Sequence, residues 1–249
     1  MLTSTATPGV FGKLPAHGDF VMRNLSSNFV NSWDEWLQGF MLATQERIGD
    51  EWLNTYLTSP IWRFVLSAGV MDDNTWTGIV MPSVDRVGRY YPFSIITQLP
   101  SNTNPMEFIS QQASWFEALE KLALAALHGQ MTIDELSNKL GEFKCSFDSS
   151  YRKNASSVGV ENSLQIDMEF EEQLPSSVYA HFLDYYLVNS LSSYSVWSTS
   201  GSERIEPCLF TTQHLPATDK MPAMLDGQWR HWGHTQPYIL AQSNIVGPA

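Results

Sequence analysis

The chain has 249 residues, of which 43% are hydrophobic and 12% aromatic, and it contains nine tryptophans. This composition excludes a largely disordered protein, and the length predicts one large domain or two closely packed lobes. The formal net charge of -12 at pH 7, with only 14 Lys and Arg residues, would repel phosphate backbones and anionic lipid. Nucleic acid is therefore not expected as a partner.

The first residues have neither the basic start nor the apolar core of a signal peptide, and no apolar window reaches the length of a membrane span. We therefore expect a cytoplasmic protein without direct membrane insertion. Cys145 and Cys208 fit a reducing compartment and have no metal-binding spacing. Both are expected to be structural thiols.

Local patterns predict the elements of the first sixty residues. Prolines bound a short mixed run, and a later serine cap is followed by apolar residues at helical spacing. In chain order we expect a strand at 9–14, a turn that presents His17 and Asp19, a helix from Ser26 or Ser27 to Gly49, and a helical piece at 51–57.

Three runs rich in β-branched and aromatic residues follow, at 61–68, 75–81 and 90–98. The gaps between them are too short for a parallel crossover, which needs a dozen or more residues, so an antiparallel meander is predicted. Because Pro82 and Pro92 cannot donate a hydrogen bond to a strand neighbour, each should mark a strand end, a bulge or an edge.

A broad apolar stripe then predicts a helix at 107–127, and a capping box of Thr132 and Glu135 predicts another at 133–143. From 144 to 175 the sequence becomes polar and acidic, with one alternating piece at 163–170 that predicts an edge strand. We place a domain boundary here, which gives an α/β domain at 1–143 and a C-terminal α/β region at 144–249, unless the two form one continuous domain.

The last third alternates between helical and strand patterns. In chain order we expect a helix capped by Ser176 or Ser177 and running through Leu187, a strand at 193–199, a turn at 201–204, a strand at 208–212, a short helix at 223–226 and an aromatic tail that contains histidines.

Charge gathers on two short loops in a chain where it is otherwise sparse. Asp85, Arg86 and Arg89 could bind an anion or a peptide carboxylate, or they could form an internal ion pair that fixes the turn. The lack of a Gly-rich cradle favours the internal ion pair.

The earlier loop carries Lys13, His17 and Asp19, which could supply an electrophile, a base and an orienting carboxylate. Their spacing matches no nucleophile elbow and no metal motif, so a structural turn is favoured. The chain offers no Walker loop, dinucleotide fingerprint or Cys-x-x-Cys pair.

His231 and His234 could bind a metal, with His214 or Asp226 as further ligands. Two histidines around a glycine, without a third at a recognisable spacing, are a weak signal, and no metal is expected. The paired tryptophans at helical spacing are expected in the core, although a large exposed aromatic patch would indicate a protein interface.

Several motifs, in consistent order over about the first 140 residues, resemble the TagF (ImpM) family of type VI secretion system accessory proteins. The motifs are the segments 9–15, 18–21 and 81–92, with Pro82, Gly88, Tyr90 and Pro92 in the last of them, the pairs Trp33 with Trp36 and Trp62 with Arg63, and, in the second half, the turn with Glu203 and Arg204.

The resemblance implies a three-layer α/β/α sandwich, with a largely antiparallel or mixed central sheet flanked by helices. It also implies a cytoplasmic, post-translational negative regulator of type VI secretion whose action is linked to the FHA-domain scaffold protein or another cytoplasmic component. No catalytic residues and no cofactor come with the family, so an enzyme is not expected.

Within this interpretation, the partner-binding surface is predicted around the two charged loops, at Lys13, His17, Asp19, Asp85, Arg86 and Arg89. The alternative is a phosphoesterase-like hydrolase that uses His17, Asp19, Asp85 and a C-terminal histidine. It requires these groups to converge in one pocket.

Overall fold

The computed structural model describes residues 7–143, 145, 164–166, 178–235 and 237–240. These residues contain one seven-stranded sheet with the order β2-β1-β5-β4-β3-β6-β7, in which every neighbouring pair is antiparallel. The strands are β1 (Gly9–Gly12), β2 (Val21–Arg23), β3 (Trp62–Leu66), β4 (Thr75–Met81), β5 (Phe93–Leu99), β6 (Tyr194–Thr199) and β7 (Cys208–Gln213).

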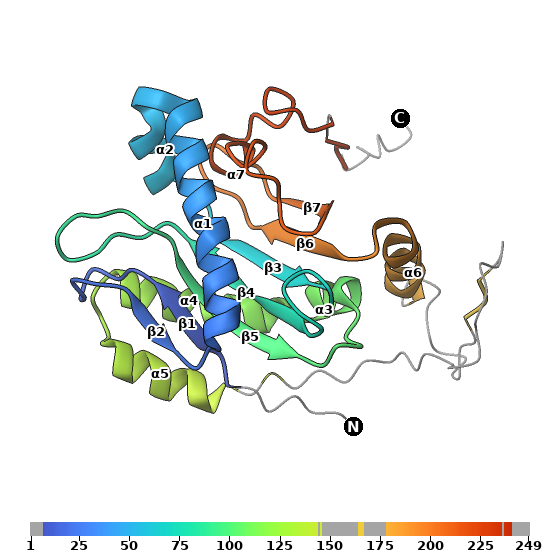
Figure 1. The fold of residues 1–249 in the computed structure, drawn as a ribbon, viewed down its shortest axis with the longest axis horizontal. Coiled ribbons are helices and arrows are strands. Elements are labelled where there is room, and N and C mark those ends of the chain that lie inside the picture. Colours follow the sequence, from blue (N-terminus) through green and yellow to red (C-terminus); the bar gives the residue numbers. More distant parts are fainter. Residues whose placement is uncertain (1–6, 144, 146–163, 167–177, 236, 241–249) are drawn as a thin grey trace, which may run out of the picture.

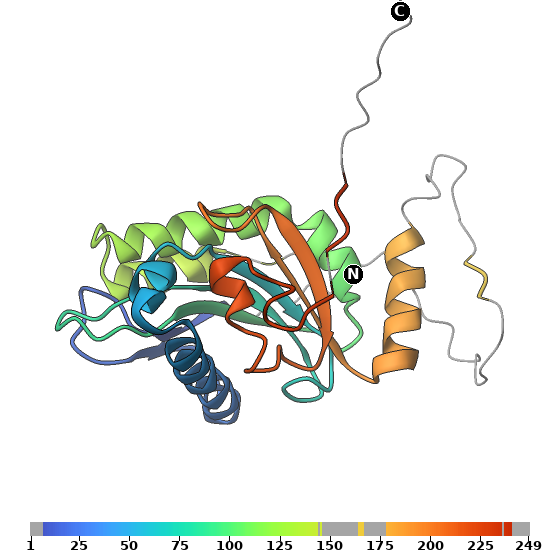
Figure 2. The same ribbon diagram turned by 90° about the horizontal axis from the view of Figure 1, so that it is seen from above.

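Helices cover both faces of the sheet. They are α1 (Ser27–Ile48), the 3-10 turn η1 (Gly49–Glu51), α2 (Trp52–Leu57), α3 (Pro105–Gln111), α4 (Ala113–Leu127), α5 (Ile133–Glu142), α6 (Tyr179–Leu191) and α7 (Ala223–Asp226). Helix α1 lies across one face, with α2 and α7 beside it, and α4 and α5 cover the other (Figure 1 and Figure 2). The predicted three-layer α/β/α sandwich is thus confirmed.

Local signals explain where several helices begin and end. Ser26 caps α1 by accepting a hydrogen bond from the Phe29 amide, and Gly49 ends the helix at a φ of 67°. Thr132 and Glu135 form the predicted capping box at the start of α5. The single helix expected at 107–127 is wrong, because the chain breaks at Gln112 into α3 and α4.

The predicted meander is confirmed, since β3 pairs with β4 and β4 with β5, both antiparallel. Pro82 follows the last residue of β4 and Pro92 precedes the first residue of β5, so both mark strand ends as expected. The third strand begins at Phe93 rather than at Tyr90, which forms only an isolated bridge with Val84. The short strand β2 was not predicted.

The C-terminal elements extend the same sheet. Strand β6 pairs with the outer side of β3, and β7 then pairs with β6. Helix α6 occupies the predicted place, although the proposed serine caps lie outside the described residues, as does most of the edge strand expected at 163–170. The division at 143 remains a prediction, because the segment that would separate the two regions also lies outside the described residues.

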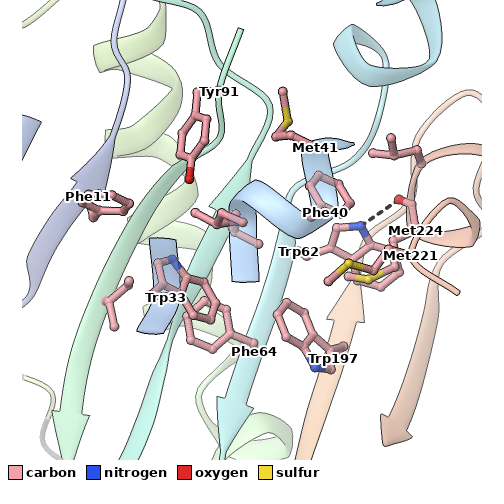
Figure 3. Packing of buried hydrophobic residues seen from close by; sticks show 14 of the residues in the cluster. Phe11, Trp33, Phe40, Met41, Trp62, Phe64, Tyr91, Trp197, Met221 and Met224 are labelled. Atoms are coloured by element: carbon pink, nitrogen blue, oxygen red, sulfur yellow. Dashed lines mark hydrogen bonds between the residues drawn. The ribbon is translucent and has the colours of Figure 1, made fainter. Parts of the chain in front are cut away.

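The core on the α1 face is aromatic. Figure 3 shows Trp33, Phe64 and Trp197 packed together, with Trp62 donating its indole hydrogen bond to the carbonyl of Met224 at 3.0 Å. The opposite face is filled mainly by aliphatic residues of the sheet together with α3, α4 and α5. Among the described residues, no helix combines the length and apolarity needed to cross a membrane.

Candidate functional site

The two charged loops meet at one end of the sheet. The segment 13–20 links β1 to β2 and the segment 82–92 links β4 to β5. Because β5 pairs with both β1 and β4, the two loops leave the sheet at the same end (Figure 1). The Arg86 amide donates a hydrogen bond to the His17 carbonyl at 2.9 Å, which joins them directly. We call this pair of segments the loop junction.

Asp85 is the centre of the loop junction. Its side chain is fully buried, and its Oδ2 lies 3.1 Å from Lys13 Nζ and 2.6 Å from Arg89 Nε. Its Oδ1 accepts the backbone N–H groups of Val87 at 3.0 Å and Arg89 at 2.9 Å. The internal ion pair favoured from the sequence is therefore present between Asp85 and Arg89, with Lys13 of the other loop as a second partner, whereas Arg86 takes no part in it.

Electrostatics keep this buried carboxylate ionised. Loss of solvent raises the pKa of Asp85, but hydrogen bonds from the Arg89 and Val87 amides and from the Lys13 and Arg89 side chains outweigh it. The net result is a pKa well below the usual range of an aspartate. The turn is thus fixed at neutral pH by a charged group and not by a neutral acid.

Further hydrogen bonds tie the loop junction to the body of the protein. Ser83 Oγ donates to the Lys13 carbonyl at 2.7 Å, and the Tyr56 hydroxyl bonds both the amide and the carbonyl of Ser83. Arg89 Nη2 donates to the Gly18 carbonyl. Because Tyr56 belongs to α2, this helix also holds the second loop in place, and hydrogen bonds anchor the base of the loop junction.

Burial separates the six predicted partner-binding residues into two groups. Lys13 and Asp85 are buried and His17 is half-buried, whereas Asp19, Arg86 and Arg89 are exposed. The six residues therefore converge on the loop junction, but only part of the set reaches its surface. Their role in binding a partner remains a prediction.

Sequence reasoning missed the exposed apolar residues here. Phe20 is 45% exposed and Val87 66% exposed. Phe20 is also held in place, because it stacks on Phe11 at 5.8 Å between ring centroids, meets the edge of Tyr91 at 4.9 Å and lies 5.1 Å from Lys13 Nζ. Period-based patterns assign no exposure to a loop residue, so no signal in the sequence identified this pair.

The C-terminal histidines do not join the loop junction. His234 Nε2 donates to the Lys220 carbonyl at 3.1 Å, and burial lowers the pKa of this imidazole. Asp226 accepts the Trp232 indole N–H at 2.7 Å, and His214 pairs with Ser193 at 2.9 Å. The described part of the chain contains no group of three His, Cys, Asp or Glu side chains that could hold a metal ion.

The remaining motif residues have structural positions. Trp33 and Trp62 are buried in the core, and Trp36 donates its indole hydrogen bond to the Pro216 carbonyl. Arg63 on β3 forms a two-pronged ion pair with Glu120 on α4 at 2.6 and 3.0 Å.

The motif residues in turns are placed as follows. Gly88 has a φ of 87°, which its turn requires. The rings of Trp52 and Tyr56 meet the Tyr90 ring edge to face. Glu203 and Arg204 are exposed in a turn closed by the Ser202 amide and the Ile205 carbonyl.

Both cysteines are free thiols, and neither is well exposed. Burial raises the pKa of Cys145 to about 12 and that of Cys208 to about 11. Each side chain is therefore a protonated, weakly reactive thiol near neutral pH, in agreement with a structural role.

An apolar cavity of about 20 Å³ lies between α1, α2, α7 and the sheet, and Tyr56, Trp62 and Pro92 are among its lining residues. It has room for about one water molecule but almost no polar lining, so it is a packing gap and not a ligand site. The loop junction remains the candidate functional site.

The fold and this junction define the class of the molecule, an α/β/α sandwich protein built on one antiparallel sheet with two ion-paired loops at its end. The model of a family described as TagF N-terminal domain, Type VI secretion system-associated, matches residues 9–143, which is more than half of the chain. The chain belongs to this family and is a type VI secretion system-associated protein.

Among solved structures, PA0076 from Pseudomonas aeruginosa PAO1 is similar to this chain, with a TM-score of 0.78 and 30% sequence identity. The similarity covers 94% of this chain and 99% of PA0076, so it includes the C-terminal elements as well as the family domain. No curated protein matches the chain. The family recognised from the sequence motifs is thereby confirmed.

Proposed function

We propose that this protein is a negative regulator of the type VI secretion system that acts after translation, in the cytoplasm, by binding the FHA-domain scaffold protein of the apparatus. Family membership supports the secretion system as the setting. One observation carries the mode of action: Asp85 fixes the two loops to each other, while Phe20, Arg86 and Val87 remain exposed on them.

A rigid exposed surface favours binding, because little conformational freedom is lost when a partner docks. Aromatic and arginine side chains are also the residues that most often dominate the free energy of protein association. The loop junction combines both properties in a protein whose described residues contain no metal-binding cluster.

The hydrolase alternative has less support. It needs Asp85 as a free acid, base or ligand, yet both oxygens of this carboxylate are engaged by Lys13, Arg89 and two backbone amides. The candidate C-terminal histidine, His234, is bonded to the Lys220 carbonyl. The proposed function therefore involves neither a catalytic residue nor a cofactor.

A secretion assay tests the regulatory role. Deletion of the gene should increase secretion by the apparatus under conditions where it is normally silent, and the wild-type gene should restore silence. The double variant Arg86→Glu and Val87→Asp, which alters two exposed side chains, should fold but should not restore it. Silence that persists after deletion would contradict the regulatory role.

The partner is tested by co-purification from the native cell. The tagged wild-type protein should retain the FHA-domain scaffold protein, and the double variant should retain much less of it. Recovery of another cytoplasmic component of the apparatus in its place would move the proposal to that partner. Recovery of no secretion component, together with unchanged secretion, would overturn it.

A further inference from the structure

Two arginines on the second loop have different environments. Arg89 is bound on both sides, by Asp85 and by the Gly18 carbonyl. Arg86 is exposed, and no carboxylate in the described part of the chain lies within ion-pair distance of it. The guanidinium of Arg86 therefore keeps donors that are not satisfied by an acid of the described residues.

The backbone of Arg86 is nevertheless held in position. Its backbone amide is bonded to the His17 carbonyl, and a β-carbon built on Gly18 would lie 3.3 Å from Arg86 Nη2. The guanidinium thus lies against the bare Gly18 backbone, whose carbonyl is bonded to Arg89. Gly18 is the contact point of both arginines.

The charge at the loop junction differs from that of the whole chain. Lys13 and Arg89 are paired with Asp85, and the more distant Arg23 faces Asp134 at 3.8 Å. This leaves Arg86 without an ion-pair partner among the described residues. On the loop junction Lys13, Arg86 and Arg89 outnumber Asp19 and Asp85 by one positive charge, in a chain of net charge -12. A partner that approaches this end with a carboxylate meets local attraction, which gives orientation as well as affinity.

Apolar contact is available on the same loop junction. Val87 follows Arg86 directly and is 66% exposed. Phe20 on the facing loop is half exposed and packs against the rings of Phe11 and Tyr91. We infer that Arg86 is the specificity-determining residue of the loop junction, and that it binds a protein segment that presents a carboxylate beside an apolar side chain. Lys13, Asp85 and Arg89 act as positioning residues for this contact.

The inference rests on the proposed function, and its test uses the full chain with the purified FHA-domain scaffold protein of the same bacterium as the probe. Arg86→Ala should raise the dissociation constant by about tenfold or more, as expected for an arginine hot spot. Arg86→Lys, which keeps the charge but not the planar fork, should give a smaller loss. Val87→Ser should weaken binding by a few-fold, about two to five.

Arg230→Ala serves as the matched control, because Arg230 is also exposed but lies near the C-terminal tail. This variant should bind like the wild type, and both arginine variants should keep the wild-type melting temperature. Raising the salt concentration should weaken the wild-type complex more than the complex of Arg86→Ala, because the variant lacks the charge that salt screens.

The outcomes separate the two levels of the proposal. Equal affinities of Arg86→Ala and Arg230→Ala, with tight wild-type binding, would overturn the role of Arg86 and leave the proposed function standing. A loss of affinity in Arg86→Ala with unchanged salt dependence would contradict the acidic nature of the partner segment. Absence of wild-type binding to the scaffold protein would overturn the proposed function and this inference together.

Discussion

The region at 9–143 and the region at 178–235 differ in what they contribute to the protein. The first contains the recognisable motifs, the family match and both loops of the loop junction. The second has few diagnostic motifs, yet β6 pairs with β3 and places Trp197 in the core beside Phe64. The motifs that identify the family therefore lie mainly in the first region, whereas both regions supply strands and core residues.

Polar contacts also join the two regions. Trp62 and Trp36 of the first region donate their indole hydrogen bonds to the carbonyls of Met224 and Pro216 in the second. Met221, Met224 and Leu225 also belong to the aromatic core on the α1 face. The second region completes a core that the first would otherwise expose, which we propose makes the two regions one folding unit.

Removal of the second region should have the largest effect on the fold. A chain that ends at residue 143 would lose β6, which pairs with β3, and would expose Phe64 and Trp36, whose rings contact Trp197. We expect an insoluble protein, or a soluble one without a cooperative thermal transition, because buried apolar surface is the main driving force of folding. Circular dichroism in the near and far ultraviolet would detect the loss.

A chain that ends at residue 235 is the matched control. The described residues beyond it are highly exposed, with Tyr238 at 99%, so their removal should change the melting temperature by no more than about 1 °C. If the chain ending at 143 melted cooperatively with native-like near-ultraviolet signals, the first region would be an independent domain. The sequence-based division at 143 would then hold.

A point substitution tests the same contact with less damage. Trp197 is fully buried, lies 5.3 Å from Phe64 between ring centroids, and donates to Ser195 at 2.8 Å. Trp197→Ala should lower the free energy of unfolding by about 3–5 kcal/mol, through lost burial and the cavity that remains. The midpoint of urea unfolding would report it.

Leu209→Ala is the control for this substitution, since Leu209 pairs with Ser198 on the neighbouring strand but is 55% exposed. It should change the free energy of unfolding by less than about 0.5 kcal/mol. Similar effects of the two substitutions would mean that β6 and β7 contribute by strand pairing alone and not by core packing.

Elements encoded by neighbouring residues could be predicted from the sequence. The capping box of Thr132 and Glu135, the stop at Gly49 and the prolines that flank the turn at 82–92 all act over a few residues. The break between α3 and α4 has no glycine or proline to mark it. A signal for the start of α3 did exist, because Asn104 followed by a proline is a common helix start.

The candidate site shows the opposite limit. Both loops could be selected from their charge, but the contact of Lys13 with Asp85 exists because β1 pairs with β5. Local periodicity does not specify which distant strands become neighbours, and β2 is too short to show any period. The exposure of Phe20 and Val87 follows from that topology and could not be read from the sequence.

The smallest of the three expected effects comes from Asp85→Asn, a substitution in the first region that lies entirely inside the loop junction. The substitution removes a charge that Lys13 and Arg89 both bind, and leaves Lys13 buried without its counter-ion. At pH 7 the melting temperature should fall by about 5 °C, with a single cooperative transition retained. The surface variant Asp73→Asn, at an exposed aspartate, should show no comparable fall.

The effect of Asp85→Asn on the melting temperature should depend on pH. The pKa of Asp85 is lower in the folded protein than the ordinary value near 3.9, so the unfolded chain binds the proton more readily. The contribution of Asp85 to stability is therefore complete above about pH 5 and is lost as the pH falls below about 4. The difference in melting temperature between the wild type and Asp85→Asn should therefore narrow as the pH falls below about 4. A constant difference from pH 7 to pH 3 would show that the carboxylate charge does not hold the loops together, and would leave shape alone as the cause of their rigidity.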